Sequence, residues 1–81
     1  MKKINMIVHV YVPRENIKDF CMDINKIKAD VNIKNENLRI NAKSLTSVTE
    51  LNKRNLLIEL IPEDMNDIQV FGSILTKYPT L

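Results

Sequence analysis

Segments with the two-residue periodicity of β-strands alternate with segments of helical periodicity along nearly the whole chain. Ile4 to Val12 is the first strand-like segment. Its inward face carries Ile4, Met6, Val8, Val10 and Val12, and its outward face carries Asn5, Ile7, His9 and Tyr11. Pro13 ends this strand, and apolar residues then recur three and four positions apart, which predicts an amphipathic helix. Its apolar residues are Ile17, Phe20, Cys21, Ile24 and Ile27, and its polar residues are Lys18, Asp19, Asp23 and Lys26.

The rest of the chain continues this alternation. We expect strands over Ala29–Lys34, Leu38–Lys43 and Leu56–Ile61, with a turn over Asn35-Glu36-Asn37 and a stop at Pro62. A short helix after Ser44 would bury Leu45, Val48 and Leu51. A last helix after Asp64 would have its apolar positions at Ile68, Phe71, Ile74 and Leu75, with Tyr78 one turn further on.

The resulting order, βαββαβα, predicts an α+β fold in which a four-stranded antiparallel sheet carries all its helices on one face. The chain has 81 residues, which is the size of one small domain covering residues 1–81. A chain of this length buries roughly 60% of its unfolded surface, so its aliphatic residues must supply a well-packed core.

Composition excludes several classes of function. The formal charge is +2 with scattered lysines, and the chain has only two Phe and two Tyr, so we expect no nucleic-acid interface. Cys21 is the only cysteine, which excludes a disulfide or a thiolate zinc site within one chain, and we expect no metal and no cofactor. No segment resembles a signal peptide or approaches a membrane span, so we expect a soluble, cytoplasmic protein with no membrane contact.

The segment Ile40-Asn41-Ala42-Lys43-Ser44-Leu45 joins an alternating strand to a helix. A serine at this junction can accept hydrogen bonds from the unsatisfied first-turn amides. Ser47 and Glu50 form a second capping signal inside the same helix. The sequence therefore allows the helix to begin after Ser44 or after Ser47.

This segment, the stretch Ala29-Asp30-Val31-Asn32-Ile33 and the order of elements together resemble HPr, the histidine-containing phosphocarrier family of the bacterial sugar phosphotransferase system. The resemblance implies an open-faced β-sandwich with sheet order 1-4-2-3. It also implies protein partners such as HPr kinase, a transcription regulator or phosphotransferase components. We expect a monomer or a weak dimer.

The family's phosphoacceptor histidine lies at the end of the first strand, in a segment of the type Gly-x-His-Ala-Arg-Pro-Ala. Here the ungapped alignment places Pro13 at the histidine and Glu15 at the arginine. The resemblance therefore implies a non-catalytic member that is not an enzyme. The alternative is an active phosphocarrier that uses His9, although we expect His9 to be a surface residue in the middle of a strand.

Ser44 has two compatible interpretations, a structural helix cap and, by resemblance, a site of regulatory phosphorylation. The implied contact residues around it are Leu45, Val48 and Leu51, and Arg14 is a candidate anion-binding side chain near the first helix. We interpret Lys53-Arg54 as solvated charge. A third hypothesis is a purely structural interaction domain that uses the open sheet face through Ile7, Tyr11 and Leu57.

Overall fold

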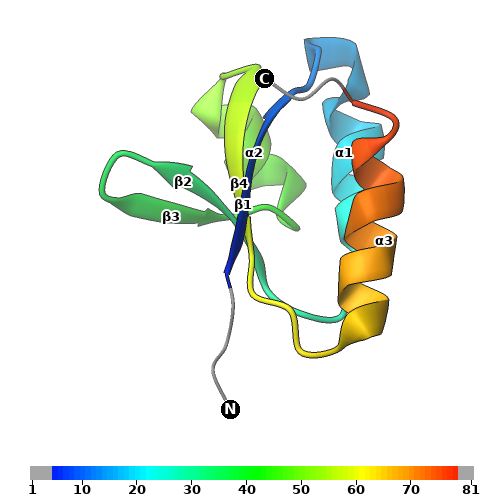
Figure 1. The fold of residues 1–81 in the computed structure, drawn as a ribbon. Helices are drawn as coiled ribbons and strands as arrows, with labels where there is room; N and C mark the ends of the chain where they lie inside the picture. The colour runs from blue at the N-terminus through cyan, green and yellow to red at the C-terminus, as the bar shows by residue number, and fades with distance from the viewer. Residues whose placement is uncertain (1–4, 79–81) are drawn as a thin grey trace.

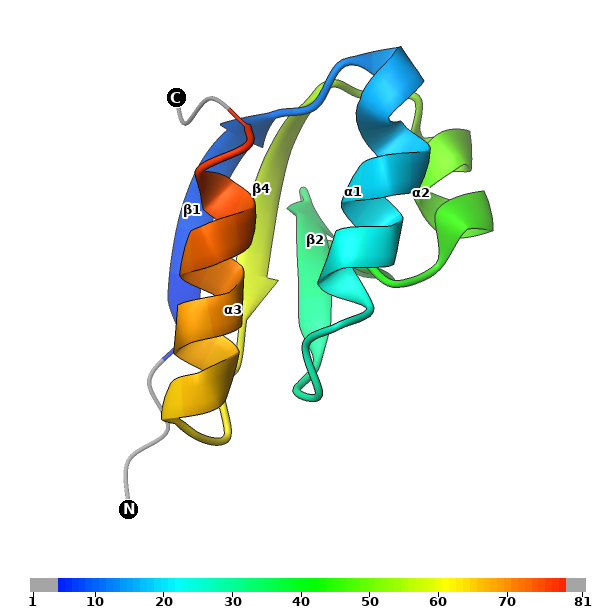
Figure 2. The same ribbon diagram turned by 90° about the vertical axis from the view of Figure 1, so that its right-hand side faces the viewer.

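The computed structural model describes residues 5–78 and consists of a four-stranded antiparallel sheet with three α-helices on one face (Figure 1). In chain order the elements are β1 (Met6–Tyr11), the 3-10 turn η1 (Arg14–Asn16), α1 (Ile17–Ile24), β2 (Val31–Asn35), β3 (Leu38–Asn41), α2 (Leu45–Leu51), β4 (Asn55–Leu60) and α3 (Met65–Leu75). The sheet order is β1-β4-β2-β3, which confirms the predicted α+β fold and strand order. Figure 2 shows α1 and α3 in front of the strands and α2 beside α1.

The core lies between the sheet and the helices. The central strand β4 places Leu56 opposite Val10 of β1 and Ile58 opposite Ile33 of β2, and all four side chains are buried. Burying an aliphatic side chain of this size contributes about 1.5–3 kcal/mol, so the strand alternation accounts for a large part of the driving force. The helices complete the core with Phe20, Ile24, Val48, Phe71 and Ile74.

The first strand and first helix are close to their predicted positions. β1 ends at Tyr11, but the Val12 amide still donates to the Arg54 carbonyl at 2.8 Å, so pairing continues up to Pro13. Ile4, which we placed at the start of this strand, lies outside the described residues. The helix ends at Ile24, earlier than predicted, and a tight turn closed by the Ile27 amide on the Ile24 carbonyl still buries Ile27.

The β2–β3 hairpin is shorter than its hydrophobic pattern predicts. β2 begins at Val31 and β3 ends at Asn41, although the Ala42 amide still donates to the Val31 carbonyl at 2.9 Å. Glu36, in the turn, has φ 57°, a left-handed conformation that costs a non-glycine residue about 1 kcal/mol. Leu38 begins β3 next to this turn and is exposed. Figure 1 shows the turn of the hairpin projecting away from α1 and α3.

The start of α3 is held by two carboxylates. Asp64 is the N-cap, as predicted, and accepts a hydrogen bond from the Asp67 amide at 3.1 Å. Asp67 is buried and accepts from the Glu63 amide at 3.0 Å. Hydrogen bonds from the Glu63 amide and further backbone amides outweigh burial and lower the pKa of Asp67. The helical periodicity does not predict that Asp67 is buried. The groups that stabilise its carboxylate are backbone amides of neighbouring loops, which the periodicity does not reveal.

The sheet face opposite the helices carries a buried glutamate. Glu59 is only 1% exposed; its Oε1 lies 3.3 Å from the Arg39 Nε, and its Oε2 accepts from the Asn5 side chain at 3.2 Å. The alternation of β4 predicts an exposed residue at this position, so the sequence does not reveal this contact. Ile7 on the same face is 49% exposed, whereas the side chains of Tyr11 and Leu57 are partly covered and less exposed than that of Ile7.

Candidate functional site

Ser44 connects β3 to α2 and caps the helix. Its backbone is extended (φ −92°, ψ 106°), and its Oγ accepts a hydrogen bond from the Ser47 amide at 3.3 Å. The Ser44 carbonyl accepts from the Val48 amide at 3.0 Å, which is the first helical bond. The predicted cap is confirmed, and the helix begins here rather than at the internal signal that starts at Ser47.

Asn25, at the end of α1, fixes the chain segment that precedes Ser44. Its side-chain amide donates to the Cys21 carbonyl at 2.7 Å and to the Lys43 carbonyl at 3.0 Å. On the other side, the Asn41 side chain accepts from the Lys43 amide at 3.0 Å. Asn25 thus links the residue before Ser44 to α1, and Asn41 links the same residue to the end of β3. Sequence reasoning missed Asn25, because nothing local indicates that it reaches residue 43.

The three apolar residues of α2 lie in different environments. Leu45 is 42% exposed beside Ser44, so the expectation that the helix buries it is wrong. Val48 is completely buried in the core, and Leu51 packs partly against that core. Leu45 is therefore available to a partner, Leu51 only in part, and Val48 supports the helix from below.

The start of α1 carries no imidazole. Pro13 precedes η1 with φ −57° and ψ 150°, and neither η1 nor α1 has a side-chain cap. Glu15 lies in the first turn and is exposed. His9 is exposed in the middle of β1, opposite Leu57, on the same sheet face as Ile7 and away from the helices. The described chain therefore does not bring its histidine to a helix N-terminus.

A cationic hollow lies beside Arg14. Arg14 Nη2 donates to the Asn52 Oδ1 at 3.0 Å, which links the start of η1 to the residue that ends α2. Asn52 has φ 53°, a left-handed conformation that asparagine tolerates better than most residues. Lys53 and Arg54 follow directly, so the fold places both beside Arg14. We name this surface, formed by Arg14, Lys53 and Arg54, the cationic hollow.

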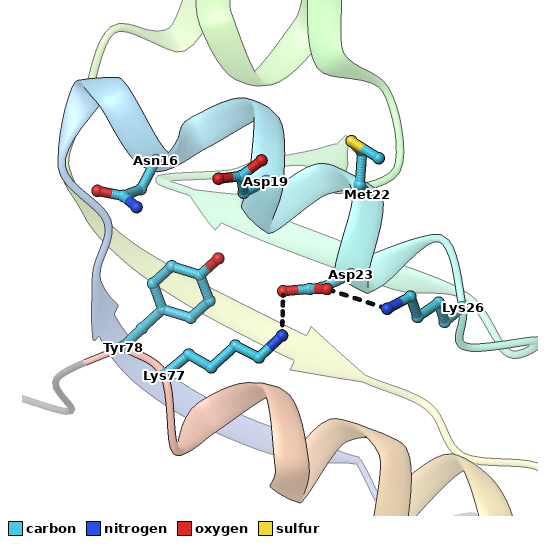
Figure 3. A pocket seen from close by; sticks show the side chains of 7 residues that line it. All are labelled: Asn16, Asp19, Met22, Asp23, Lys26, Lys77 and Tyr78. Carbon is cyan, nitrogen blue, oxygen red and sulfur yellow. Dashed lines mark hydrogen bonds and ion pairs between the residues drawn. The ribbon is translucent and has the colours of Figure 1, made fainter.

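A second polar pocket, of about 330 Å³, lies between α1 and the end of α3 (Figure 3). Asp23 is buried there and contacts the ammonium groups of Lys77 at 3.2 Å and Lys26 at 3.4 Å. Burial disfavours the ionised carboxylate, but hydrogen bonds from Lys77 and Lys26 outweigh it and lower the pKa of Asp23. The sequence placed Asp23 among the polar residues of this helix, but it did not reveal that Lys77 and Tyr78, which follow α3, cover it.

Tyr78 and Met22 line this pocket, whereas Phe20 and Cys21 belong to the hydrophobic core. The rings of Tyr78 and Phe20 meet edge to face with centroids 5.2 Å apart. Burial raises the pKa of Tyr78, and the carboxylates of Asp23 and Asp19 raise it further. Burial also raises the pKa of the Cys21 thiol, so this cysteine is an unreactive core residue. The pocket contains a neutralised ion cluster and no activated nucleophile.

Within residues 5–78, no helix is both long enough and apolar enough to cross a bilayer. In the same part of the chain, no three His, Cys, Asp or Glu side chains gather as metal ligands would. No protein-family model matches the sequence, and no curated protein matches it significantly. A function must therefore be argued from the Ser44 junction, the start of α1 and the cationic hollow.

Proposed function

We propose that this chain is a non-catalytic, HPr-like regulatory module that acts by binding a protein partner, and that phosphorylation of Ser44 controls this binding. The observation that carries the proposal is the placement of Ser44, a half-exposed N-cap residue next to the exposed side chain of Leu45. The segment around it resembles the regulatory segment of HPr, and it lies in a sheet of order β1-β4-β2-β3.

The surroundings of Ser44 are compatible with an added phosphoryl group. The first turn of α2 contains no acidic residue, so no neighbouring carboxylate of that turn would repel a group carrying a charge of about −1.5 to −2. Lys43 precedes the serine and adds a cation. The Oγ makes one hydrogen bond, at 3.3 Å, which is long for a donor–acceptor pair and easily given up.

Pro13 supports the non-catalytic part of the proposal. A proline ring nitrogen inside a peptide bond cannot accept a phosphoryl group, and Pro13 is the residue that directly precedes η1. The alternative phosphocarrier would need His9, which lies in the middle of β1 on the face away from α1. There the amides that begin a helix could not stabilise a phosphoryl group.

The experiment is intact-mass analysis after incubation with HPr kinase and ATP. We expect the wild-type chain to gain one phosphoryl group and Ser44→Asn to gain none. Asparagine caps a helix about as well as serine, so this variant removes the hydroxyl and retains the fold. Ser47→Ala, a change of the neighbouring serine in the same turn, is the matched control and should still be modified.

An unchanged wild-type mass would refute the Ser44 switch, as would a phosphoryl group that persists in Ser44→Asn. The partner contact is tested with the phosphorylated chain and Leu45→Gln, which removes the apolar side chain without adding a carboxylate beside the phosphoryl group. If Leu45 forms part of the contact, this exposed substitution abolishes the pull-down of the transcription regulator that binds phosphorylated HPr, and leaves the melting temperature unchanged. Retained binding would place the contact elsewhere.

A further inference from the structure

The cationic hollow consists of two adjoining depressions between the start of α1 and the loop that joins α2 to β4. The smaller, of about 240 Å³, is lined by Arg14, Lys53 and Arg54 together with Ile17, Thr49 and Asn52. The larger, of about 530 Å³, is lined by the same cations and opens past Tyr11 and Asn55. No aspartate or glutamate lines either depression.

The polar contacts of these cations are with neutral groups. Arg14 donates to the Asn52 side-chain oxygen at 3.0 Å, and the Lys53 ammonium donates to the Asn35 side-chain oxygen at 2.7 Å. An amide oxygen can orient a cation without cancelling its charge. In the part of the chain that the structure describes, none of the ion pairs includes Arg14, Lys53 or Arg54.

Other cations of the molecule are used differently. Lys26 and Lys77 contact the buried Asp23, and Arg39 contacts the buried Glu59. Those cations compensate carboxylates that the fold has removed from water. The cationic hollow concentrates three unneutralised charges at one place, although the whole chain carries a formal charge of only +2.

We propose that the cationic hollow is a binding site for a phosphate group. Two guanidinium groups and an ammonium group match the charge and the several acceptor oxygens of a phosphate monoester better than those of a single carboxylate. The smaller depression would hold the phosphate group. The larger depression, with the half-buried Tyr11 at its side, would hold the atoms that carry it. This site goes beyond the proposed function, because it uses neither Ser44 nor a modification of the chain.

Calorimetric titration of the unmodified 81-residue chain with inorganic phosphate, at constant ionic strength, tests the site. We expect saturable binding, and each arginine that is removed should weaken it roughly tenfold, as expected for a lost charge-assisted hydrogen bond. The test variant is the double change Arg14→Gln, Arg54→Gln. The matched control is Lys18→Gln, Lys28→Gln, which removes two exposed cations elsewhere and lowers the net charge equally.

The proposal holds if the control pair binds phosphate like the wild-type chain and the arginine pair does not. It is overturned if binding does not saturate or if both pairs weaken it equally, since either result would mean unspecific attraction to a basic surface. A phosphoserine peptide identifies the source of the phosphate group. If this peptide binds more tightly than inorganic phosphate, the natural ligand of the hollow is a phosphorylated protein. If it binds more weakly, the natural ligand is a small phosphorylated molecule. Equal binding of the peptide without its phosphate would contradict the site.

Discussion

The pocket between α1 and α3 and the cationic hollow both contain lysine or arginine, but the two regions use these residues for different purposes. In the pocket, Lys26 and Lys77 contact a carboxylate that is 11% exposed, and with the carboxylate of Asp19, which also lines the pocket, the charges cancel. In the hollow, Arg14 and Lys53 are oriented by amide oxygens, and their charges persist. The partner decides the role: a buried carboxylate makes a cation part of the fold, and a neutral partner leaves it available for a ligand.

The largest expected effect is the loss of the carboxylate in the neutralised region. Asp23→Ala should lower the free energy of unfolding by about 2 kcal/mol, less than for a fully buried ion pair, because both lysines are more than half exposed. Urea unfolding measures this change. Asp19→Ala removes an exposed carboxylate from the same helix and should cost less than about 0.5 kcal/mol. If both variants lost the same unfolding free energy, Asp23 would contribute no more to the fold than the exposed Asp19.

Acid should weaken the same region. The pKa of Asp23 is lowered in the folded chain from its ordinary value of 3.8, so its stabilising contribution is present above that value and is lost as pH falls through the folded pKa. Asp67 acts in the same direction. Unfolding free energies measured from pH 6 down to pH 2 should therefore fall less steeply for Asp23→Asn than for the wild-type chain. Parallel curves would contradict a role for Asp23 as an ionised partner.

One substitution neutralises the Arg14 part of the cationic hollow. Asn52→Asp places a carboxylate against Arg14 at a left-handed position that aspartate also tolerates. We expect phosphate affinity to fall roughly tenfold, since an internal anion then competes for the guanidinium group. Calorimetric titration measures the affinity, and unfolding should change by less than about 0.5 kcal/mol. Undiminished phosphate affinity would show that Arg14 is not part of the site.

The smallest effects concern single cations. Lys77→Gln should cost about 0.5 kcal/mol, as for an exposed partner of an ion pair, whereas Arg54→Gln should cost nothing measurable, since it has no carboxylate partner among the described residues. Thermal unfolding at low salt measures both changes. A larger loss for Arg54→Gln than for Lys77→Gln would reverse the comparison.

The sequence predicted the fold well because strand and helix periodicities are local. The inward positions Val10, Ile33 and Phe71 are buried, and Ser44 and Asp64 cap the helices that they precede. The charged contacts were not predictable in the same way. Lys77 and Asp23 are 54 positions apart, and Arg14 and Asn52 are 38 apart. Only the fold brings such residues together.

The candidate site shows the same limit. Ser44, Pro13 and Arg14 could be singled out from the sequence, because they lie in or beside motifs with a known physical role. Lys53 and Arg54 could only be interpreted as solvated charge, because their proximity to Arg14 depends on where α2 ends. The left-handed conformation of Asn52 sets that end, and a single sequence does not reveal it.

The division between neutralised and unneutralised cations is tested most directly by mapping amide chemical shifts during a titration of the labelled wild-type chain with inorganic phosphate. We predict saturable shifts at Arg14 and at residues 52–55, which line the cationic hollow, and unchanged shifts at Asp23, Lys26 and Lys77, which line the pocket between α1 and α3. Shifts of equal size in both regions, or shifts confined to the pocket between α1 and α3, would contradict this division between neutralised and unneutralised cations.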